Sequence, residues 1–421
     1  MSLSRPGAHA LLRSSLLAPF QVRSFRFQYP ADLLTSWGGE MENLILGWYI
    51  LVATGSVLLL TLFGSLQYFG TLVAPLLGLA GDRLGHRNVL CAMRAVYATL
   101  AALVATLAFS GWLNPADVFV LAAIGGLVRP ADLAMRSALV AETIPSDRLI
   151  GAMGASRTTA DSARIAGSLA GAGLFAAFGM GPAYLGITLV YITGFLLTLG
   201  TGAPRRYVEV LPRFAFWRDL REGLTYVWDA PSSLAALLLA FLVNMTAFPL
   251  TSGLLPYVAR EIYHIDQTGL GTLVASFAGG SLIGSITISM AGRLIRPARM
   301  MLVFAIAWYA MLLVFAHMPD APHGRAVLLL AGLAQSLSLV PMSVMLLQGA
   351  GERFRGRVMG LRMLAIYGLP IGLMATGALI GRCGFTAATT LLCSTGLLLT
   401  LVIAVHWRAD LWPREAPANG R

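Results

Sequence analysis

Long apolar runs alternate with short polar segments along nearly the whole chain. A membrane-spanning helix needs about 20 mostly apolar residues. Twelve runs approach or exceed that length, at residues 31–55, 57–80, 89–112, 116–141, 149–178, 182–201, 232–259, 267–291, 299–317, 324–349, 358–381 and 385–406. Most connections are too short to form a soluble domain. The pattern therefore predicts an all-α integral membrane protein with twelve transmembrane helices.

Residues 202–231 form the one long connection, with six runs on either side. The predicted domains are an N-terminal tail (1–30), a first six-helix bundle (31–201), a linker (202–231), a second six-helix bundle (232–406) and a C-terminal tail (407–421). In the linker, apolar residues recur near helical spacing among charged ones: Phe214, Trp217, Leu220, Leu224, Tyr226 and Val227. This favours an amphipathic helix on the membrane surface over a solvated linker helix.

The two halves resemble each other in sequence. "SDRLIGAMGASRTTADSARIAG" begins the fifth run and "RFRGRVMGLRMLAIYGLPIG" begins the eleventh. Each opens with an Arg-containing loop and continues into a run of small residues. Repeats of this kind imply two parallel six-helix halves, and hence two pseudo-symmetric bundles.

The composition fits a membrane protein: 57% of residues are hydrophobic and 12% are charged, against about 25% charged in soluble domains. The net charge is +11, and all 30 basic residues are arginine. In a soluble protein this would suggest a nucleic-acid partner. Here the arginines lie mainly between apolar runs, as the positive-inside rule describes. We expect contact with a lipid bilayer and no nucleic acid.

Alternate connections carry most of the positive charge. The N-terminus and the even-numbered connections are rich in arginine, whereas the odd-numbered ones hold only Arg260, Arg325 and Arg382. Both termini are therefore predicted to face the cytoplasm of a bacterial inner (plasma) membrane. The first 27 residues contain no acid, which would also suit a mitochondrial presequence. A cytoplasmic tail explains their charge more simply.

The sequence contains no recognisable catalytic pattern. Cys91, Cys383 and Cys393 form no C-x-x-C pair, and the six histidines have no metal-ligand spacing. No phosphate-binding loop or Ser-His-Asp signature is present. We expect no enzymatic activity, no metal and no cofactor.

Charged residues inside the predicted spans need a reason, because each costs about 2.5–3.5 kcal/mol at the bilayer centre. Arg129, Asp132 and Arg136 share one helix face, as do Arg157, Asp161 and Arg164. The proton-coupling candidates are Glu40, Glu42, Asp132 and Asp161, with Arg129, Arg136, Arg157 and Arg164 as their charge partners. The alternative is a purely structural network in which acids and arginines neutralise one another.

The second half carries almost no charge inside its spans, which suggests that it supplies substrate contacts. The substrate-cavity candidates from both halves are Tyr49, Tyr68, Asn244, Phe248, Gln335 and Tyr367. Ordinary membrane packing would explain the same residues.

The loop "GLAGDRLGHRNVL" resembles the signature G-x-L-A-D-R-x-G-R-[RK]-x-x-L between helices 2 and 3 of the major facilitator superfamily. Gly78, Asp82, Arg83, Gly85, Arg87 and Leu90 match it, while Ala80, Gly81 and His86 depart from it. The resemblance implies the major facilitator fold and secondary transport by rocking of two bundles. It also implies a conformational latch, in which Asp82 meets the start of helix 11 near Arg355 or Arg357.

Further segments resemble the branch that includes the enterobactin exporter and macrolide efflux proteins. They include "SWGGEMENLILGWYILVATGS" in the first run and "REGLTYVWDAP" in the linker. This resemblance implies proton-coupled efflux of a drug or siderophore, with Glu40 as the first proton-coupling candidate. In the fifth run, Gly167–Ala172 lacks the proline and the last glycine of a common antiporter element. Proton-coupled uptake therefore stays open, as does a non-transporting membrane sensor. We expect a monomer.

Overall fold

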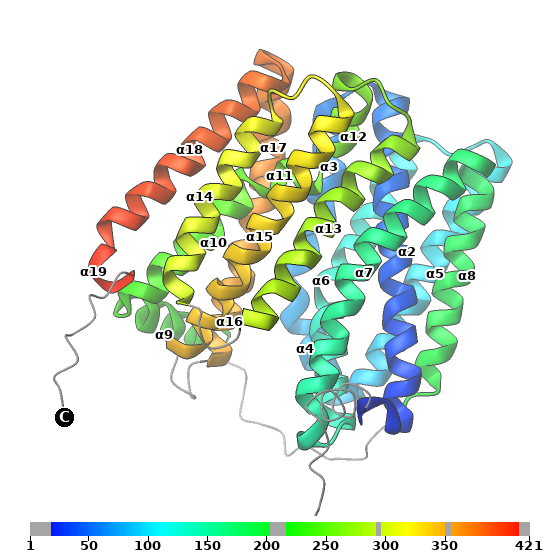
Figure 1. Ribbon diagram of the computed structural model, residues 1–421. Helices are drawn as coiled ribbons and strands as arrows, with labels where there is room; N and C mark the ends of the chain where they lie inside the picture. The colour runs from blue at the N-terminus through cyan, green and yellow to red at the C-terminus, as the bar shows by residue number, and fades with distance from the viewer. Residues whose placement is uncertain (1–17, 203–215, 292–295, 350–354, 412–421) are drawn as a thin grey trace, which may run out of the picture. The chain divides into compact units, whose positions relative to one another are not determined.

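The computed structural model describes residues 18–202, 216–291, 296–349 and 355–411, which are almost entirely helical (Figure 1). The chain divides into two compact units, Met1–Leu46 with Leu66–Val210 and Gly47–Ser65 with Leu211–Arg421. Helix α2 thus contributes to both units. The domain boundaries expected from the sequence stay a prediction.

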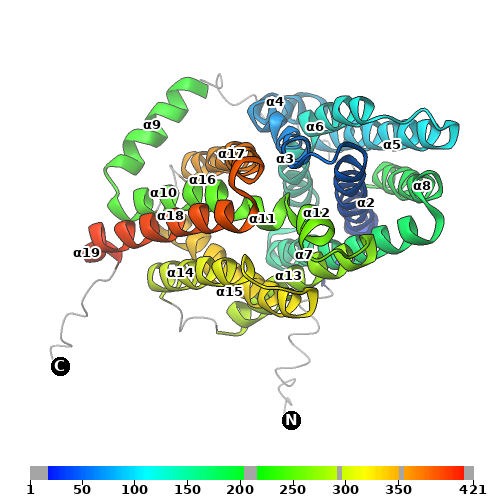
Figure 2. The same cartoon turned by 90° about the horizontal axis from the view of Figure 1, so that it is seen from above.

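The first unit is built mainly from long helices that pack lengthwise, with α5 running along α8 (Figure 2). Its elements are η1 (Ala18–Gln21), most of α2 (Arg23–Thr54), η2 (Phe69–Leu72), α4 (Ala74–Leu84), α5 (His86–Ser110), α6 (Pro115–Thr143), α7 (Ser146–Phe178) and α8 (Met180–Leu199). Helix α6 begins with a capping box, in which the Asn114 side chain accepts from the backbone N–H of Asp117 while the Asp117 carboxylate accepts from that of Asn114.

The second unit contains more interrupted helices. Its elements are α3 (Val57–Leu66), α9 (Phe216–Trp228), α10 (Pro231–Thr246), α11 (Phe248–Ser252), α12 (Leu255–Tyr257), the π-helical turn η3 (Val258–Ile262), α13 (Gln267–Ala291), α14 (Pro297–Phe315), α15 (Ala321–Gly349), α16 (Arg355–Leu364), η5 (Ala365–Tyr367), α17 (Gly368–Cys383), α18 (Phe385–His406) and α19 (Arg408–Leu411). Helix α15 packs against both α13 and α14.

Each of the twelve predicted spans coincides with a helix or an interrupted helix. Among the described residues, eight helices are long and apolar enough to cross a membrane. The other four predicted spans fall outside that set. Helices α2 and α7 carry charged residues, and the spans formed by α3–α4 and α10–α12 are divided into shorter helices.

One glycine turn recurs at matching places in the two units. Gly179 joins α7 to α8 with φ +78°, and Gly384 joins α17 to α18 with φ +79°. Only glycine adopts such a conformation readily. The two turns lie six spans apart, as expected for the internal repeat.

The first helix starts earlier than the sequence pattern predicts. The predicted span begins at residue 31, but α2 already begins at Arg23. The reason is a small apolar cluster in which Phe25 packs with Val140, Ile144 and Ala152. Residues from 23 to 30 are therefore part of the folded first unit.

Close backbone contact joins α13 to α15. A Cβ atom at Gly280 would lie 2.9 Å from the backbone nitrogen of Leu333 and would overlap the carbonyl of Leu329. Its neighbour Gly279 faces open space. Gly280 thus allows the two helices to approach, as small residues do in membrane bundles.

The substitution Gly280→Ala should therefore lower the free energy of unfolding by about 1–3 kcal/mol, because the α13–α15 contact becomes overpacked. Gly279→Ala is the matched control and should leave stability unchanged or slightly higher. Thermal unfolding of the purified protein in detergent measures both. Equal melting temperatures for the two variants would contradict the contact.

Candidate functional site

A cavity of about 280 Å³ lies within the first unit, lined by residues of α2, α5, α6, α7 and α8. Its lining contains three carboxylates and three arginines: Asp32, Glu40, Asp132, Arg129, Arg136 and Arg164. Ser36, Asn43, Tyr97 and Tyr191 add neutral polar groups. The cavity therefore gathers charges from helices that are far apart in sequence.

Arg94 of α5 anchors the innermost part of this network. Its side chain is fully buried and pairs with Asp32 of α2. It also donates to the hydroxyl of Thr198 and, at 3.4 Å, to the carbonyl oxygen of Gly194 in α8. One guanidinium thus ties three helices together.

Arg136 of α6 extends the network along α2. It pairs with Asp132 one turn earlier on its own helix, and its Nε lies 3.7 Å from Asp32. It donates to the Ser36 hydroxyl at 2.7 Å and to the Asp32 carbonyl oxygen at 3.1 Å. The second oxygen of Asp132 is buried and has no hydrogen-bond partner among the described residues.

A second group of polar contacts surrounds Arg129, also on α6. Arg129 pairs with Glu42 and donates to the Asn43 side chain at 3.2 Å. The Tyr191 hydroxyl donates to Glu42 at 3.0 Å. The guanidinium also lies 6.0 Å from the ring centre of Tyr97, at the outer limit for a cation–π contact. Both the acid and the arginine are thereby held in place.

Glu40 differs from the other acids. Its carboxylate lies 3.9 Å from Nε of Arg164 on α7, and the two side chains are 29% and 41% exposed. The Asp32, Glu42 and Asp132 side chains are 5–12% exposed and make close ion pairs. Glu40 and Arg164 therefore form the most open of these pairs.

The structure brings together five of the eight charged residues predicted to couple protons or balance charge, as lining of this cavity: Glu40, Asp132, Arg129, Arg136 and Arg164. Glu42 joins them through Arg129. Asp161 and Arg157 lie on α7, but their side chains are outside the described part of the structure.

Arg94, Tyr97 and Tyr191 were not among the residues predicted from the sequence. Arg94 could have been recognised from the sequence, since it is an arginine within an otherwise apolar run. The two tyrosines could not, because membrane helices contain many aromatic residues that only pack.

None of the predicted substrate-cavity residues is among those that line the charged cavity, but Tyr68 interacts electrostatically with Glu40, Arg129 and Arg164 of its lining. Tyr68 belongs to the first unit, and the others belong to the second. Gln335 is buried and accepts from Ser281 at 3.4 Å. Phe248 packs edge-on against Trp308, and Asn244 donates to the carbonyl of Ala240 in its own helix.

The residues of the predicted latch lie in α4, at the turn between α4 and α5, and at the start of α16. Gly78, Asp82 and Arg83 belong to α4, and Gly85 separates α4 from α5. Arg87 donates to the carbonyl oxygen of Leu199. The side chains of Asp82 and Arg355 are outside the described part of the structure.

Two further contacts involve residues at the start of α5 and at the start of α16. His86, which departs from the family signature, lies 2.6 Å from the Glu142 carboxylate at the end of α6. In the second unit, Arg357 at the start of α16 pairs with Glu222 of α9.

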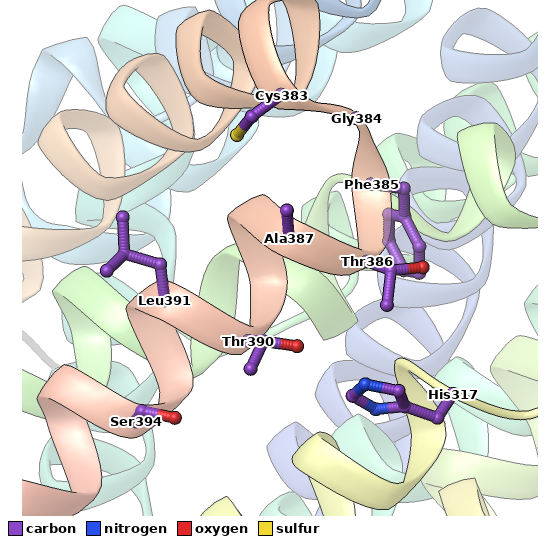
Figure 3. Close-up of a pocket in the computed structure, with 9 residues that line it drawn as sticks. All are labelled: His317, Cys383, Gly384, Phe385, Thr386, Ala387, Thr390, Leu391 and Ser394. Carbon is purple, nitrogen blue, oxygen red and sulfur yellow. The ribbon is translucent and has the colours of Figure 1, made fainter.

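A second hollow, of about 750 Å³, lies at the turn between α17 and α18 (Figure 3). His317, Phe385 and Leu391 are among its lining residues. It is wide open and holds no carboxylate or arginine among its lining residues, so it lacks the charge chemistry of the first cavity. Among the described residues, no group of three or more His, Cys, Asp or Glu side chains could hold a metal ion.

The sequence matches the family model of the Major Facilitator Superfamily over residues 30–375. The chain belongs to this superfamily. No curated protein matched it.

Solved transporter structures share the fold. A mutant of the nucleoside transporter NupG superposes with a TM-score of 0.70 at 14% identity, covering 92% of this chain and 99% of that one. The D-xylose–proton symporter gives 0.72 at 11%, covering 90% and 96%. The human organic anion transporter MFSD10 (TETRAN) gives 0.64 at 19%, covering 90% and 98%.

Family and fold together identify a multi-pass membrane protein that works as a secondary transporter, not as an enzyme. They confirm the predicted fold class. At these identities the solved structures show the fold alone. The substrate and the direction of transport are therefore argued below from the residues of this chain.

The Arg94–Asp32 pair generates a stability prediction. Arg94→Met should lower the free energy of unfolding by about 3–5 kcal/mol, because it leaves the buried Asp32 carboxylate poorly compensated. The double variant Arg94→Met/Asp32→Asn should recover part of this loss, since no buried charge is stranded. Thermal unfolding in detergent measures both, with Arg408→Gln as the exposed control. A double variant less stable than Arg94→Met would contradict the pairing.

Proposed function

We propose that this superfamily member is a proton-coupled exporter of an amphipathic organic molecule, such as a drug or siderophore. It works by alternating access of two six-helix bundles. It resides in a bacterial inner membrane as a monomer with both termini in the cytoplasm. The arginine alternation supports this orientation. The resemblance of several segments to the enterobactin and macrolide exporter branch supports export.

The observation that carries the proposal is the open pairing of Glu40. A carboxylate that transports protons must be reached by water and must be able to change its partner. The Glu40 side chain is 29% exposed, borders the cavity and lies 3.9 Å from Arg164. Asp32 and Glu42 are held in closer and more buried pairs. Glu40 can therefore gain and lose a proton without breaking the buried framework.

This arrangement gives a simple exchange. When Glu40 is ionised, it attracts Arg164 and any cationic or hydrogen-donating group of a cargo molecule. When Glu40 is protonated, that attraction disappears and the cargo is released. Proton and cargo thus compete for one carboxylate, which is the requirement for antiport. Asp132 is the second candidate, because one of its oxygens has no partner among the described residues.

Proton-coupled uptake is the alternative, and one feature favours it. The antiporter element of the fifth span is incomplete at Gly167–Ala172. In its place, α7 packs tightly on α2: a Cβ at Gly171 would lie 2.8 Å from the Met41 Cα, and one at Gly167 3.0 Å from the Trp37 carbonyl oxygen. Everted membrane vesicles distinguish the two directions, because an energised exporter accumulates its cargo inside them.

Glu40→Gln should lower the rate of gradient-driven transport at least tenfold while leaving the amount of folded protein unchanged. The carboxamide keeps the shape of the side chain but cannot take up a proton. Transport of a panel of amphipathic dyes into everted vesicles measures the effect, with Glu261→Gln as a control at an exposed acid of the second unit. Proton-driven accumulation at the wild-type rate in Glu40→Gln would rule out its role.

The loop between α4 and α5 is proposed to latch one conformation of the transporter. Asp82 would be stabilised at the positive N-terminal end of α16, the first part of the eleventh predicted span, with help from Arg355 or Arg357. Asp82→Asn should slow transport several-fold without changing which dyes compete with one another. Initial rates and competition constants in vesicles separate the two effects. An unchanged rate would argue against the latch, and an altered order of competition would assign Asp82 to recognition instead.

A further inference from the structure

Helix α9 of the linker changes direction sharply where it meets the membrane-spanning α10. The two helices are bent by 114° at the short break between Trp228 and Pro231, so α9 turns across the end of α10 (Figures 1 and 2). If α10 runs along the membrane normal, α9 runs close to the membrane plane.

One face of α9 contacts α15 and α16 of the second unit. Glu222 pairs with Arg357 of α16 at 2.9 Å, and the Tyr226 hydroxyl donates to the carbonyl oxygen of Gly349 in α15 at 2.9 Å. Val227 is buried. Gly223 lies so close to α16 that a Cβ there would be 3.3 Å from the Arg357 Cβ. This face holds the ends of α15 and α16.

The opposite face of α9 is exposed and has a mixed character. Leu224 and Trp228 stand one turn apart and are 50% and 73% exposed. Arg218 and Arg221 lie on the same side of the helix, since residues three, four and seven positions apart share a face. The Arg218 side chain is 70% exposed, and its contact with Glu222 is a loose 3.7 Å.

Two large apolar side chains flanked by two arginines suit one kind of surface, the headgroup layer of a membrane that contains anionic lipid. Tryptophan favours this layer. The adjoining α10 also exposes apolar side chains, Leu238 and Phe241, as a helix that faces lipid does. A solvated helix would gain nothing from exposing Trp228.

We infer that the outer face of α9, formed by Arg218, Arg221, Leu224 and Trp228, is a binding site for anionic phospholipid. The arginines contact the headgroup phosphates, while Leu224 and Trp228 enter the layer beneath them. Because the inner face of α9 is fastened to α15 and α16, bound lipid restrains the ends of both helices. The site therefore links lipid composition to the second unit, independently of the charged cavity.

A dye on the exposed face tests this site in the full chain. Thr225 lies on that face and is exposed, so Thr225→Cys accepts an environment-sensitive fluorophore. Cys383→Ser removes the exposed native thiol, while Cys91 and Cys393 are buried. The labelled protein is placed in vesicles of phosphatidylcholine alone or of an equimolar mixture with phosphatidylglycerol. The emission should shift to the blue in the mixed vesicles, and added salt should reduce the shift.

Arg218→Gln and Arg221→Gln should each raise the phosphatidylglycerol fraction needed for half the shift by about fivefold, the equivalent of one lipid-bound arginine. Arg382→Gln removes an exposed arginine from the last turn of α17 and should have no effect. Equal emission in both kinds of vesicle would overturn the proposal. So would a phosphatidylglycerol response that survives in the double variant, or a label already shielded in detergent, which would indicate that protein covers the face.

Hydrogen exchange in Arg355–Leu364 provides a second readout. It should slow in the mixed vesicles for the unlabelled wild-type chain and not for Arg218→Gln/Arg221→Gln. Exchange that is the same in both vesicles would contradict the restraint on α16. Neither measurement requires transport, so a failure here is distinct from a failure of proton-coupled export.

Discussion

The cost of a charge in hydrocarbon governs the first unit. Arg94 has no exposed side-chain surface, yet it lies within a helix that is long and apolar enough to span a membrane. Such a group is tolerated only when it is paired and hydrogen-bonded. Arg94 meets this demand with Asp32 of α2 and with two oxygens of α8. The rotation of these helices about their axes is thereby fixed, since turning any one of them would strand a charge.

The other ion pairs around the cavity differ in how closely their partners approach. Arg136 connects Asp32 to Asp132, and Arg129 holds Glu42 through a close pair. The last pair, Glu40 with Arg164, is the most exposed and the most widely spaced of those around the cavity. A rigid inner layer and a loose outer pair suit different tasks. The inner layer stabilises the bundle, while the outer pair can open, which is why the proposed chemistry falls on Glu40.

Much of this could be predicted from the sequence because membrane helices follow simple rules. The apolar runs located all twelve spans, and helical spacing placed Arg129, Asp132 and Arg136 on one face that does line the cavity. Partner choice could not be predicted, because it depends on which helices meet in space. The pairing of Arg94 with Asp32, and the role of Tyr191 in holding Glu42, come from tertiary packing. Likewise, the early start of α2 depends on Phe25 finding an apolar cluster on α6 and α7.

The helices of the second unit pack together without ion pairs in their interior, as far as its described residues show. Its ion pairs lie near helix ends, as in Arg357 with Glu222. Inside, neutral hydrogen bonds such as Thr246 with Tyr309, and close backbone contact at Gly280, join the helices. Neutral contacts do not change when the proton concentration changes. Among the described residues, the acids paired with arginines inside the predicted spans therefore lie in the first unit, and the proposed proton coupling is assigned there for that reason.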